Sequence, residues 1–197
     1  MPSSLDLSPL KAFLRAIHPV SDEVLDLYLD AAKPLGVPRK TILTMEGEVQ
    51  KDLLLVITGI QKSYFLREGK PHIMAFTYAP SFSGLPDSFF TQNPATYFLE
   101  TITASQFLRI PYEQHQQFMA EYREIESLSR KATEGILVGF IQRHYELMAL
   151  DIETRLRTFL KRSPHLLQQL SQKDLAAYLR IDPTNLSKLL NRVRLVE

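Results

Sequence analysis

Short polar and basic side chains occur at close spacing in "LSQKDLAAYLRIDPTNLSKLLNRV", residues 170–193. Apolar residues at helical spacing form two runs on either side of Arg180-Ile181-Asp182, which predicts two helices joined by a turn. A hairpin that only closes a core would carry more acidic residues on its outer face. The second helix instead turns outward side chains that hydrogen-bond base edges and phosphates, and we expect it to bind double-stranded DNA. These residues are Thr184, Asn185, Ser187, Lys188, Asn191 and Arg192.

Capping residues and charge agree with this interpretation. Ser171, with Asp174 three positions later, suits the start of the first helix, and Asp182 followed by Pro183 suits the start of the second. Residues 151–197 carry nine Lys/Arg against five Asp/Glu, a net charge of +4, whereas the preceding residues carry 14 against 17. A basic segment fits a surface that faces phosphates, although many solvated helical tails have the same composition.

Other kinds of chemistry have little support in the sequence. Without cysteine there can be no disulfide, cysteine-ligated zinc or conventional iron–sulfur cluster. Nucleophile-elbow, phosphate-loop and His-Glu-x-x-His motifs are absent, and Asp151 and Glu153 suit a helix start better than catalysis. We therefore expect no catalytic residue, no metal and no cofactor, in a soluble cytoplasmic protein without a membrane segment. The five histidines are scattered, at His18, His72, His115, His144 and His165.

The elements that must position the DNA-binding residues follow from the periodicity of the chain. The first thirty residues predict two short helices separated at His18-Pro19, with Ser21 as cap of the second. Residues 33–110 predict an antiparallel barrel or sandwich with a short helix at 85–90. After Pro111 we expect one or two helices, the second one long, and a further helix at 152–161. The expected strands are 41–45, 53–57, 61–66, 72–78 and 97–110.

The long helix, at about residues 125–150, carries more apolar surface than contact with a single neighbour requires. Gly135 and Gly139 lie four residues apart within it, where another backbone could approach or where the helix could bend. We expect this helix to pair two subunits in a homodimer. The interface would include Ile136, Leu137, Phe140 and Ile141.

The order of these parts is more specific than any one of them. The segment "MEGEVQKDLLLVITGIQKSYFLREGKPHIMAFTYAPSFSG", the long helix and the helix-turn-helix together resemble the Crp-Fnr superfamily of transcription regulators, most closely its divergent branch common in Bacteroidetes. The resemblance implies an α+β fold with an antiparallel, jelly-roll-like β-roll that senses an effector. It also implies three domains: the roll at 1–120, a dimerisation helix at 121–150 and a DNA-binding domain at 151–197. DNA and RNA polymerase are the implied partners.

The chain departs from the family where cyclic AMP would bind. Family members hold the phosphate with a Gly-Glu pair and an Arg-Ser or Arg-Thr pair, but here the matching positions are Gly84-Leu85 and Ala95-Thr96. The acceptor and the cation are both missing, so we expect an effector other than cyclic AMP, or none. The polar residues that meet the base fall at Phe140 and Ile141. The remaining candidate pocket comprises Gly84, Leu85, Asp87, Ser88, Thr96, Tyr97 and Phe140.

A second departure follows the recognition helix, where only residues 194–197 remain and the family usually continues into a β-hairpin wing. We therefore expect weaker DNA binding per subunit than in winged relatives. The alternative function is an effector-binding or protein-interaction β-roll whose C-terminal helices only pack. The outward face of residues 184–192 distinguishes the two hypotheses.

Overall fold

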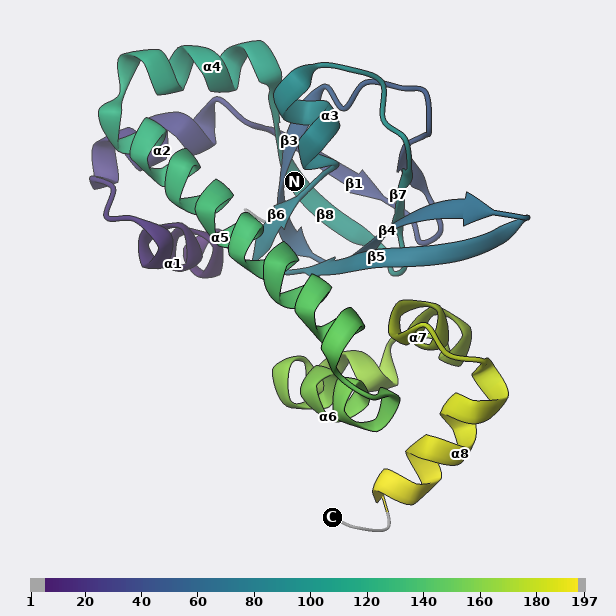
Figure 1. Cartoon of the computed structure of the whole chain (residues 1–197). Coiled ribbons are helices and arrows are strands. Elements are labelled where there is room, and N and C mark those ends of the chain that lie inside the picture. The colour runs from purple at the N-terminus through teal and green to yellow at the C-terminus, as the bar shows by residue number, and fades with distance from the viewer. Residues whose placement is uncertain (1–5, 195–197) are drawn as a thin grey trace. The chain divides into compact units, whose positions relative to one another are not determined.

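The computed structural model describes residues 6–194, with side chains described up to residue 192. Residues 195–197, part of the segment where a wing was expected to be missing, lie outside the described residues. The fold is of the mixed α+β class that the sequence predicts, with antiparallel sheets, a long helix and further C-terminal helices (Figure 1).

Two four-stranded sheets form the β-roll. The first sheet has the order β1-β8-β3-β6, with β1 at Lys33–Val37, β8 at Ser105–Pro111, β3 at Asp52–Thr58 and β6 at Ser81–Ser83. The second has the order β2-β7-β4-β5, with β2 at Ile42–Thr44, β7 at Phe98–Thr101, β4 at Ile60–Arg67 and β5 at Lys70–Tyr78. Buried apolar side chains from both sheets, such as Val56, Leu99 and Phe107, fill the interior.

The observed strands differ from the predicted ones at three places. The expected strand at 97–110 is two strands, β7 and β8, which belong to different sheets. Strands β1 and β6 were missed, because β1 contains Pro34 and Gly36 and β6 has only three residues. Proline is tolerated in β1 because that strand lies at a sheet edge, where it pairs with β8 from Lys33↔Arg109 to Val37↔Ser105. Pairing with a distant strand decides such an element, and local sequence does not show it.

The tight turn between β3 and β4 depends on Gly59. Its φ is +98°, and a Cβ at this position would lie 2.2 Å from Oγ of Ser105 and 2.7 Å from the backbone oxygen of Ala104. No side chain fits there without moving β8, because backbone and side-chain atoms both block the space. Gly59 therefore allows the chain to turn directly from the end of β3 at Thr58 into β4 at Ile60.

The helices α1 (Ser8–Ile17) and α2 (Asp22–Asp30) pack on the roll through a shared apolar core. Leu14 and Leu25 are fully buried against Leu55 and Ile110 of β3 and β8. Burying each such side chain contributes roughly 1.5–3 kcal/mol. Other buried members of this core are Leu10, Val20, Tyr28, Leu29, Ala32, Leu108, Ile125 and Leu128.

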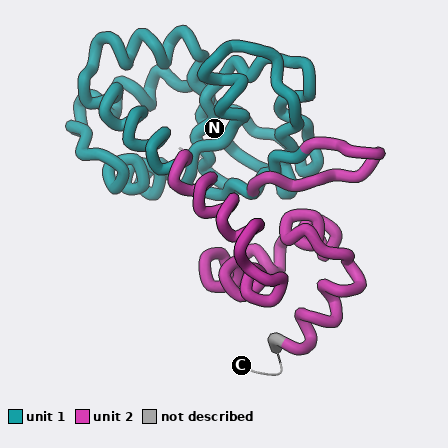
Figure 2. Tube along the Cα trace, in the orientation of Figure 1, with its two compact units in different colours: residues 1–64, 76–135 teal, residues 65–75, 136–197 magenta. Residues whose placement is uncertain are grey.

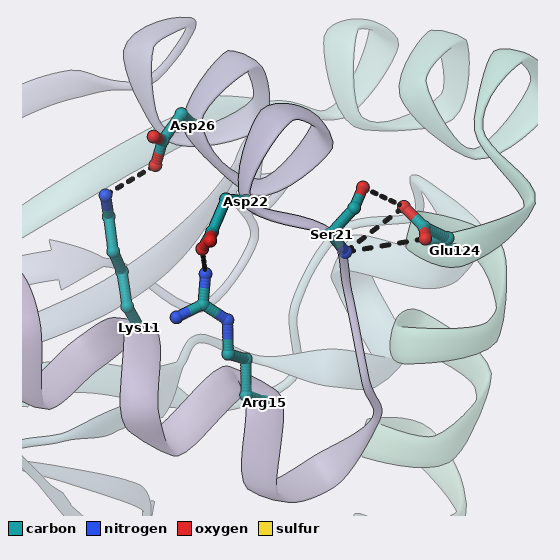
Figure 3. Close-up of polar contacts among 6 residues, drawn as sticks. All are labelled: Lys11, Arg15, Ser21, Asp22, Asp26 and Glu124. Atoms are coloured by element: carbon teal, nitrogen blue, oxygen red, sulfur yellow. Dashed lines mark hydrogen bonds and ion pairs between the residues drawn. The ribbon is translucent and has the colours of Figure 1, made fainter.

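Two ion pairs connect α1 with α2 on the outside of this core (Figure 3). Lys11 pairs with Asp26, and Arg15 pairs with Asp22. Exposed pairs of this kind contribute little to stability individually, so the buried leucines determine the packing of the two helices.

Ser21 occupies the N-cap position of α2 as predicted, but its side chain does not cap the helix. Its Oγ instead donates to Oε2 of Glu124 at 2.7 Å (Figure 3). The predicted N-cap position is therefore confirmed, but the capping hydrogen bond is absent because a carboxylate from a distant helix takes the serine hydroxyl. This bond fastens the start of α5 to α2.

Three helices follow within and after the roll: α3 (Pro86–Thr91), α4 (Tyr112–Glu121) and α5 (Arg123–Ala149). The short helix expected at 85–90 is α3, and the expected pair after Pro111 is α4 and α5, which break at Tyr122. A Cβ added at Gly135 or Gly139 would meet nothing within 4 Å, so the described structure leaves room for a side chain at both positions.

A buried histidine joins three of these helices. Nδ1 of His115 on α4 lies 2.8 Å from the hydroxyl of Tyr28 on α2, and Nε2 lies 3.0 Å from Oγ of Ser129 on α5. Burial lowers the pKa of His115 to about 4, so the imidazole is neutral at physiological pH. Both ring nitrogens are therefore satisfied without a charge.

The chain divides into two compact units, 1–64 with 76–135 and 65–75 with 136–197 (Figure 2). Helix α5 contributes to both, because the division falls after Gly135. The second unit also contains α6 (Ile152–Arg162), the 3-10 helix η1 (Pro164–Gln168), α7 (Gln172–Leu179) and α8 (Pro183–Arg194).

Candidate nucleic-acid interface and effector site

The helix-turn-helix begins each of its helices at the predicted cap. Oγ of Ser171 accepts the backbone N–H of Asp174 at 3.0 Å and starts α7. Oδ1 of Asp182 accepts the backbone N–H of Thr184 at 2.8 Å and starts α8. This backbone hydrogen bond lowers the pKa of the Asp182 carboxyl, which is ionised at neutral pH. The caps thus fix the position of the turn.

The inward faces of α7 and α8 close a small apolar core. Leu175 and Leu179 of α7 are buried together with Leu186 and Leu190 of α8, as the helical periodicity predicts. Phe159 of α6 packs in the same unit, with its ring centroid 5.5 Å from that of Tyr178. The packing leaves the opposite face of α8 available to a partner.

That opposite face carries most of the predicted DNA-binding residues. Ser187 is only half-buried, because it lies toward the core edge of the helix. The others are exposed: Thr184, Asn185, Lys188, Asn191 and Arg192. The sequence pattern therefore placed the outward face of α8 correctly.

One of these side chains already has an ionic partner. Arg192 pairs with Glu153 of α6, and Glu153 also accepts a 3.0 Å hydrogen bond from Nη2 of Arg157. The side chain of Arg192 is nevertheless 65% exposed. Asp151 caps α6 by accepting the N–H of Thr154 at 2.8 Å, so the helix-start role predicted for Asp151 is confirmed.

A buried ionic cluster connects α5 with α6 in the second unit. The carboxylate of Glu146, almost fully buried, lies 3.5 Å from Nη1 of Arg143 and 2.8 Å from Nη1 of Arg162. Nη2 of Arg162 also donates to the hydroxyl of Tyr178 on α7 at 3.0 Å. Sequence reasoning missed these residues, since their spacing does not show that they meet.

The two positions that the family resemblance assigns to the cyclic-nucleotide contacts, Leu85 and Ala95, are apolar and buried. Leu85, at the start of α3, has no exposed surface, and Ala95 is 3% exposed. Thr96 is exposed. Gly84 has a φ of +150°, and Gln50 lies 3.7 Å from where its Cβ would be. Neither Leu85 nor Ala95 can supply the carboxylate or the cation that the ribose and phosphate of cyclic AMP would need.

Neighbouring polar groups bond one another. The hydroxyl of Ser88 accepts the backbone N–H of Gln50 at 3.0 Å and donates to the backbone oxygen of Asn93 at 2.6 Å. The Tyr97 hydroxyl donates to Asp87, and burial together with this carboxylate raises the pKa of Tyr97. Of the predicted pocket residues, the structure therefore brings Asp87 and Tyr97 together. The Ser88 hydroxyl instead bonds backbone groups of the roll.

A second chain of polar side chains crosses the interior of the roll. Nε2 of Gln61 on β4 donates to Oγ of Ser105 on β8 at 3.0 Å. Oε1 of Gln61 accepts from the Thr77 hydroxyl at 3.2 Å, and this hydroxyl lies 3.0 Å from Oγ of Ser83. Sequence reasoning missed these residues as well, although a glutamine at a buried strand position was a possible signal.

The predicted dimer residues lie on the second-unit half of α5. Ile136 is half-buried, whereas Leu137, Phe140 and Ile141 are exposed, Phe140 by 42% and Ile141 by 61%. Phe140 was also assigned to the effector pocket, whose other members all belong to the first unit. Further large apolar side chains exposed on this helix are Val138, Tyr145 and Met148.

The described part of the chain offers neither a membrane span nor a metal cluster. Between residues 6 and 194 no helix has the length and apolar character needed to cross a membrane. Within the same range no three His, Asp or Glu side chains gather as a metal ion would require.

Residues 35–122 match the family model of the cyclic nucleotide-binding domain. No curated protein matches the sequence significantly. Several solved structures share the fold. FixK2 from Bradyrhizobium japonicum is 19% identical with a TM-score of 0.73, and the match covers 83% of this chain and 84% of that chain. The c-di-GMP responsive global regulator CLP from Xanthomonas campestris is 16% identical with a TM-score of 0.66, covering 88% and 92%.

A third similar structure, from Eubacterium rectale, is described as a transcriptional regulator of the Crp/Fnr family. It is 14% identical with a TM-score of 0.69, and the match covers 89% of this chain and 84% of that chain. The fold is thus that of a Crp/Fnr-type regulator, as the sequence resemblance predicted.

Proposed function

We propose that the chain is a homodimeric transcription regulator of the Crp/Fnr type that binds double-stranded DNA. The observation that carries this proposal is the exposed donor-rich face of α8, which a capped and packed helix-turn-helix presents to solvent. The proposed domains are a sensor roll at 1–120, a dimerisation helix at 121–150 and a DNA-binding domain at 151–197. RNA polymerase is the proposed protein partner.

In this proposal α8 enters the major groove. Asn185 pairs with adenine and Lys188 with guanine, each contact providing roughly 1–3 kcal/mol of discrimination. Thr184 and Arg192 contact phosphates, which position the helix without reading sequence. Two such helices in a two-fold dimer would read half-sites about 10 base pairs apart.

The dimer forms through α5. Val138, Ile141, Tyr145 and Met148 are all exposed and are spaced by three and four residues, the spacing of a coiled-coil seam. Isolated exposed apolar residues are common, but a continuous stripe on one helix favours a partner helix. A second copy of α5 supplies such a stripe by symmetry.

The roll is proposed to sense a small molecule other than cyclic AMP. A glutamate bonded to the ribose and an arginine paired with the phosphate would together contribute several kcal/mol of binding free energy. The residues at the positions that the resemblance assigns to them, Leu85 and Ala95, are apolar and buried. The Asp87–Tyr97 pair and the hydroxyl groups near Gln61, which bond one another in this structure, are the polar groups that we propose for contact with another ligand.

Selection of duplexes from a random pool at about 50 mM salt tests DNA binding. The unmodified chain should enrich a palindrome, Lys188→Ala should relax its sequence preference, and Arg192→Ala should weaken binding to all sequences. If nothing is enriched and Lys188→Ala behaves like the parent, the chain is instead an effector-binding or protein-interaction module with a purely structural helical domain.

A further inference from the structure

Arg180 occupies a backbone conformation that favours glycine. It follows the last residue of α7 with φ 56° and ψ 52°, in the left-handed region. The backbone N–H groups of Arg180 and Ile181 both reach the backbone oxygen of Ala176, the second at 3.0 Å, which is the hydrogen-bond pattern of a helix end closed by a left-handed residue. Any side chain with a Cβ is strained there.

A comparable position in the roll shows how a side chain can offset this strain. Gln92 ends α3 with φ 54°, and its Nε2 donates to the backbone oxygen of Phe89 at 2.6 Å. The glutamine side chain thereby helps to close its own helix. Arg180 is exposed, and its guanidinium makes no hydrogen bond or ion pair with another described residue. No interaction of this side chain with the described residues therefore offsets the backbone strain at Arg180.

The position of Arg180 in the chain indicates a role for its side chain in DNA binding. It lies two residues before Asp182, the residue that caps α8, so it is part of the turn that leads into the recognition helix. The carboxylate of Asp182 places a negative charge at this end of α8, where a DNA phosphate would be repelled. A cation in the same turn offsets that charge and is attracted to the backbone that borders the groove.

We propose that Arg180 is a DNA-backbone contact, retained in a strained position because its guanidinium binds a phosphate beside the N-terminus of α8. This inference rests on the proposed DNA binding and adds a residue that helical periodicity did not identify, because Arg180 lies in the turn. The contact is to phosphate and carries no sequence preference.

The test uses the full chain and a fluorescent duplex of random sequence, titrated at several salt concentrations from about 50 mM upward. Arg180→Gly removes the charge and relieves the strain, whereas Arg180→Gln removes the charge and keeps the strain. Arg180→Lys retains both. Lys51→Gln, at an exposed lysine of the roll, is the matched control for loss of one positive charge.

Arg180→Gly should unfold at a higher denaturant concentration than the parent and yet bind DNA several-fold more weakly. Its plot of log affinity against log salt should flatten by about one unit per subunit. Arg180→Gln should lose affinity and salt dependence to the same extent without the gain in stability. Arg180→Lys and Lys51→Gln should bind like the parent.

Two outcomes would overturn the inference in distinguishable ways. If the parent binds duplex DNA but Arg180→Gly binds equally well, or loses affinity with an unchanged salt slope, Arg180 is no phosphate contact and the proposed function stands. If the parent itself does not bind at low salt, the proposed function fails and the inference fails with it.

Discussion

The guanidinium carbon of Arg143 lies 3.8 Å from the ring centroid of Tyr178, and Nη2 of Arg143 donates to the backbone oxygen of the same tyrosine. Arg143 belongs to α5 and Tyr178 to α7, so the contact joins the proposed dimerisation helix to the helix-turn-helix. Buried cation–π contacts of this kind contribute about 2 kcal/mol. Together with Glu146 and Arg162, they fasten the C-terminal half of α5 to α6 and α7.

Glu146→Gln should destabilise the second unit by about 2–3 kcal/mol, because it leaves two arginines near each other without the buried carboxylate that pairs with both. Urea unfolding followed by circular dichroism measures the change. Glu134→Gln on the same helix is the control: Glu134 pairs with Arg130 and Lys131 in solvent, and no measurable change is expected. Equal effects of the two substitutions would contradict the importance of the buried cluster.

Ile141→Glu should convert the homodimer to a monomer without unfolding it. The side chain is 61% exposed in the single chain, so the charge adds no burial cost there, whereas it would be desolvated in a paired α5. Light scattering after size-exclusion chromatography measures the mass, and circular dichroism checks the fold. A parent protein that is monomeric at tens of micromolar, about 1 mg/ml, would refute the dimer.

Cyclic AMP at about 1 mM should leave the melting temperature of the protein unchanged. A ligand present at about 100 times its dissociation constant would add about 2.7 kcal/mol of stability, so low-micromolar binding would be evident. Calorimetry then gives the affinity directly. Binding in the low micromolar range would show that Leu85 and Ala95 do not occupy the phosphate-binding positions.

Glu153→Gln should strengthen DNA binding. The carboxylate pairs with Arg192 and Arg157, and its removal frees the first of these for phosphate and reduces repulsion of the DNA. We expect a several-fold gain in affinity with a steeper salt dependence. Glu113→Gln, at an exposed residue of α4, should leave affinity unchanged. A loss of affinity in Glu153→Gln would mean that the ion pair orients Arg192 for binding.

Stability should fall between pH 6.5 and 4 partly through His115. Burial lowers its folded-state pKa to about 4 from an ordinary value of 6.5. The unfolded chain therefore takes up the proton first, so the stabilisation is complete above pH 6.5 and declines as pH falls toward 4. Above pH 6.5 this pKa shift contributes about 3 kcal/mol to the free energy of unfolding. His115→Gln should show a shallower decline in urea-unfolding free energy over this range, and His144→Gln, at an exposed residue, should follow the parent.

Much of the helical architecture is encoded locally. Ser171 and Asp182 begin α7 and α8 where the sequence predicted, because a cap requires only a side-chain oxygen and a nearby backbone N–H. The outward face of α8 follows from its apolar periodicity for the same reason. The turn glycines likewise mark the ends of strands, as at Gly59, where only glycine fits beside Ser105.

Contacts between distant segments were decided by the tertiary structure. Strand β1 exists because β8 pairs with it, and Ser21 bonds Glu124, more than a hundred residues away, in place of its own helix. The meeting of Arg143 with Tyr178 likewise depends on how α5 and α7 pack. Hydrogen bonds and ion pairs form wherever folding brings partners within about 3–4 Å, and sequence spacing alone does not specify that proximity.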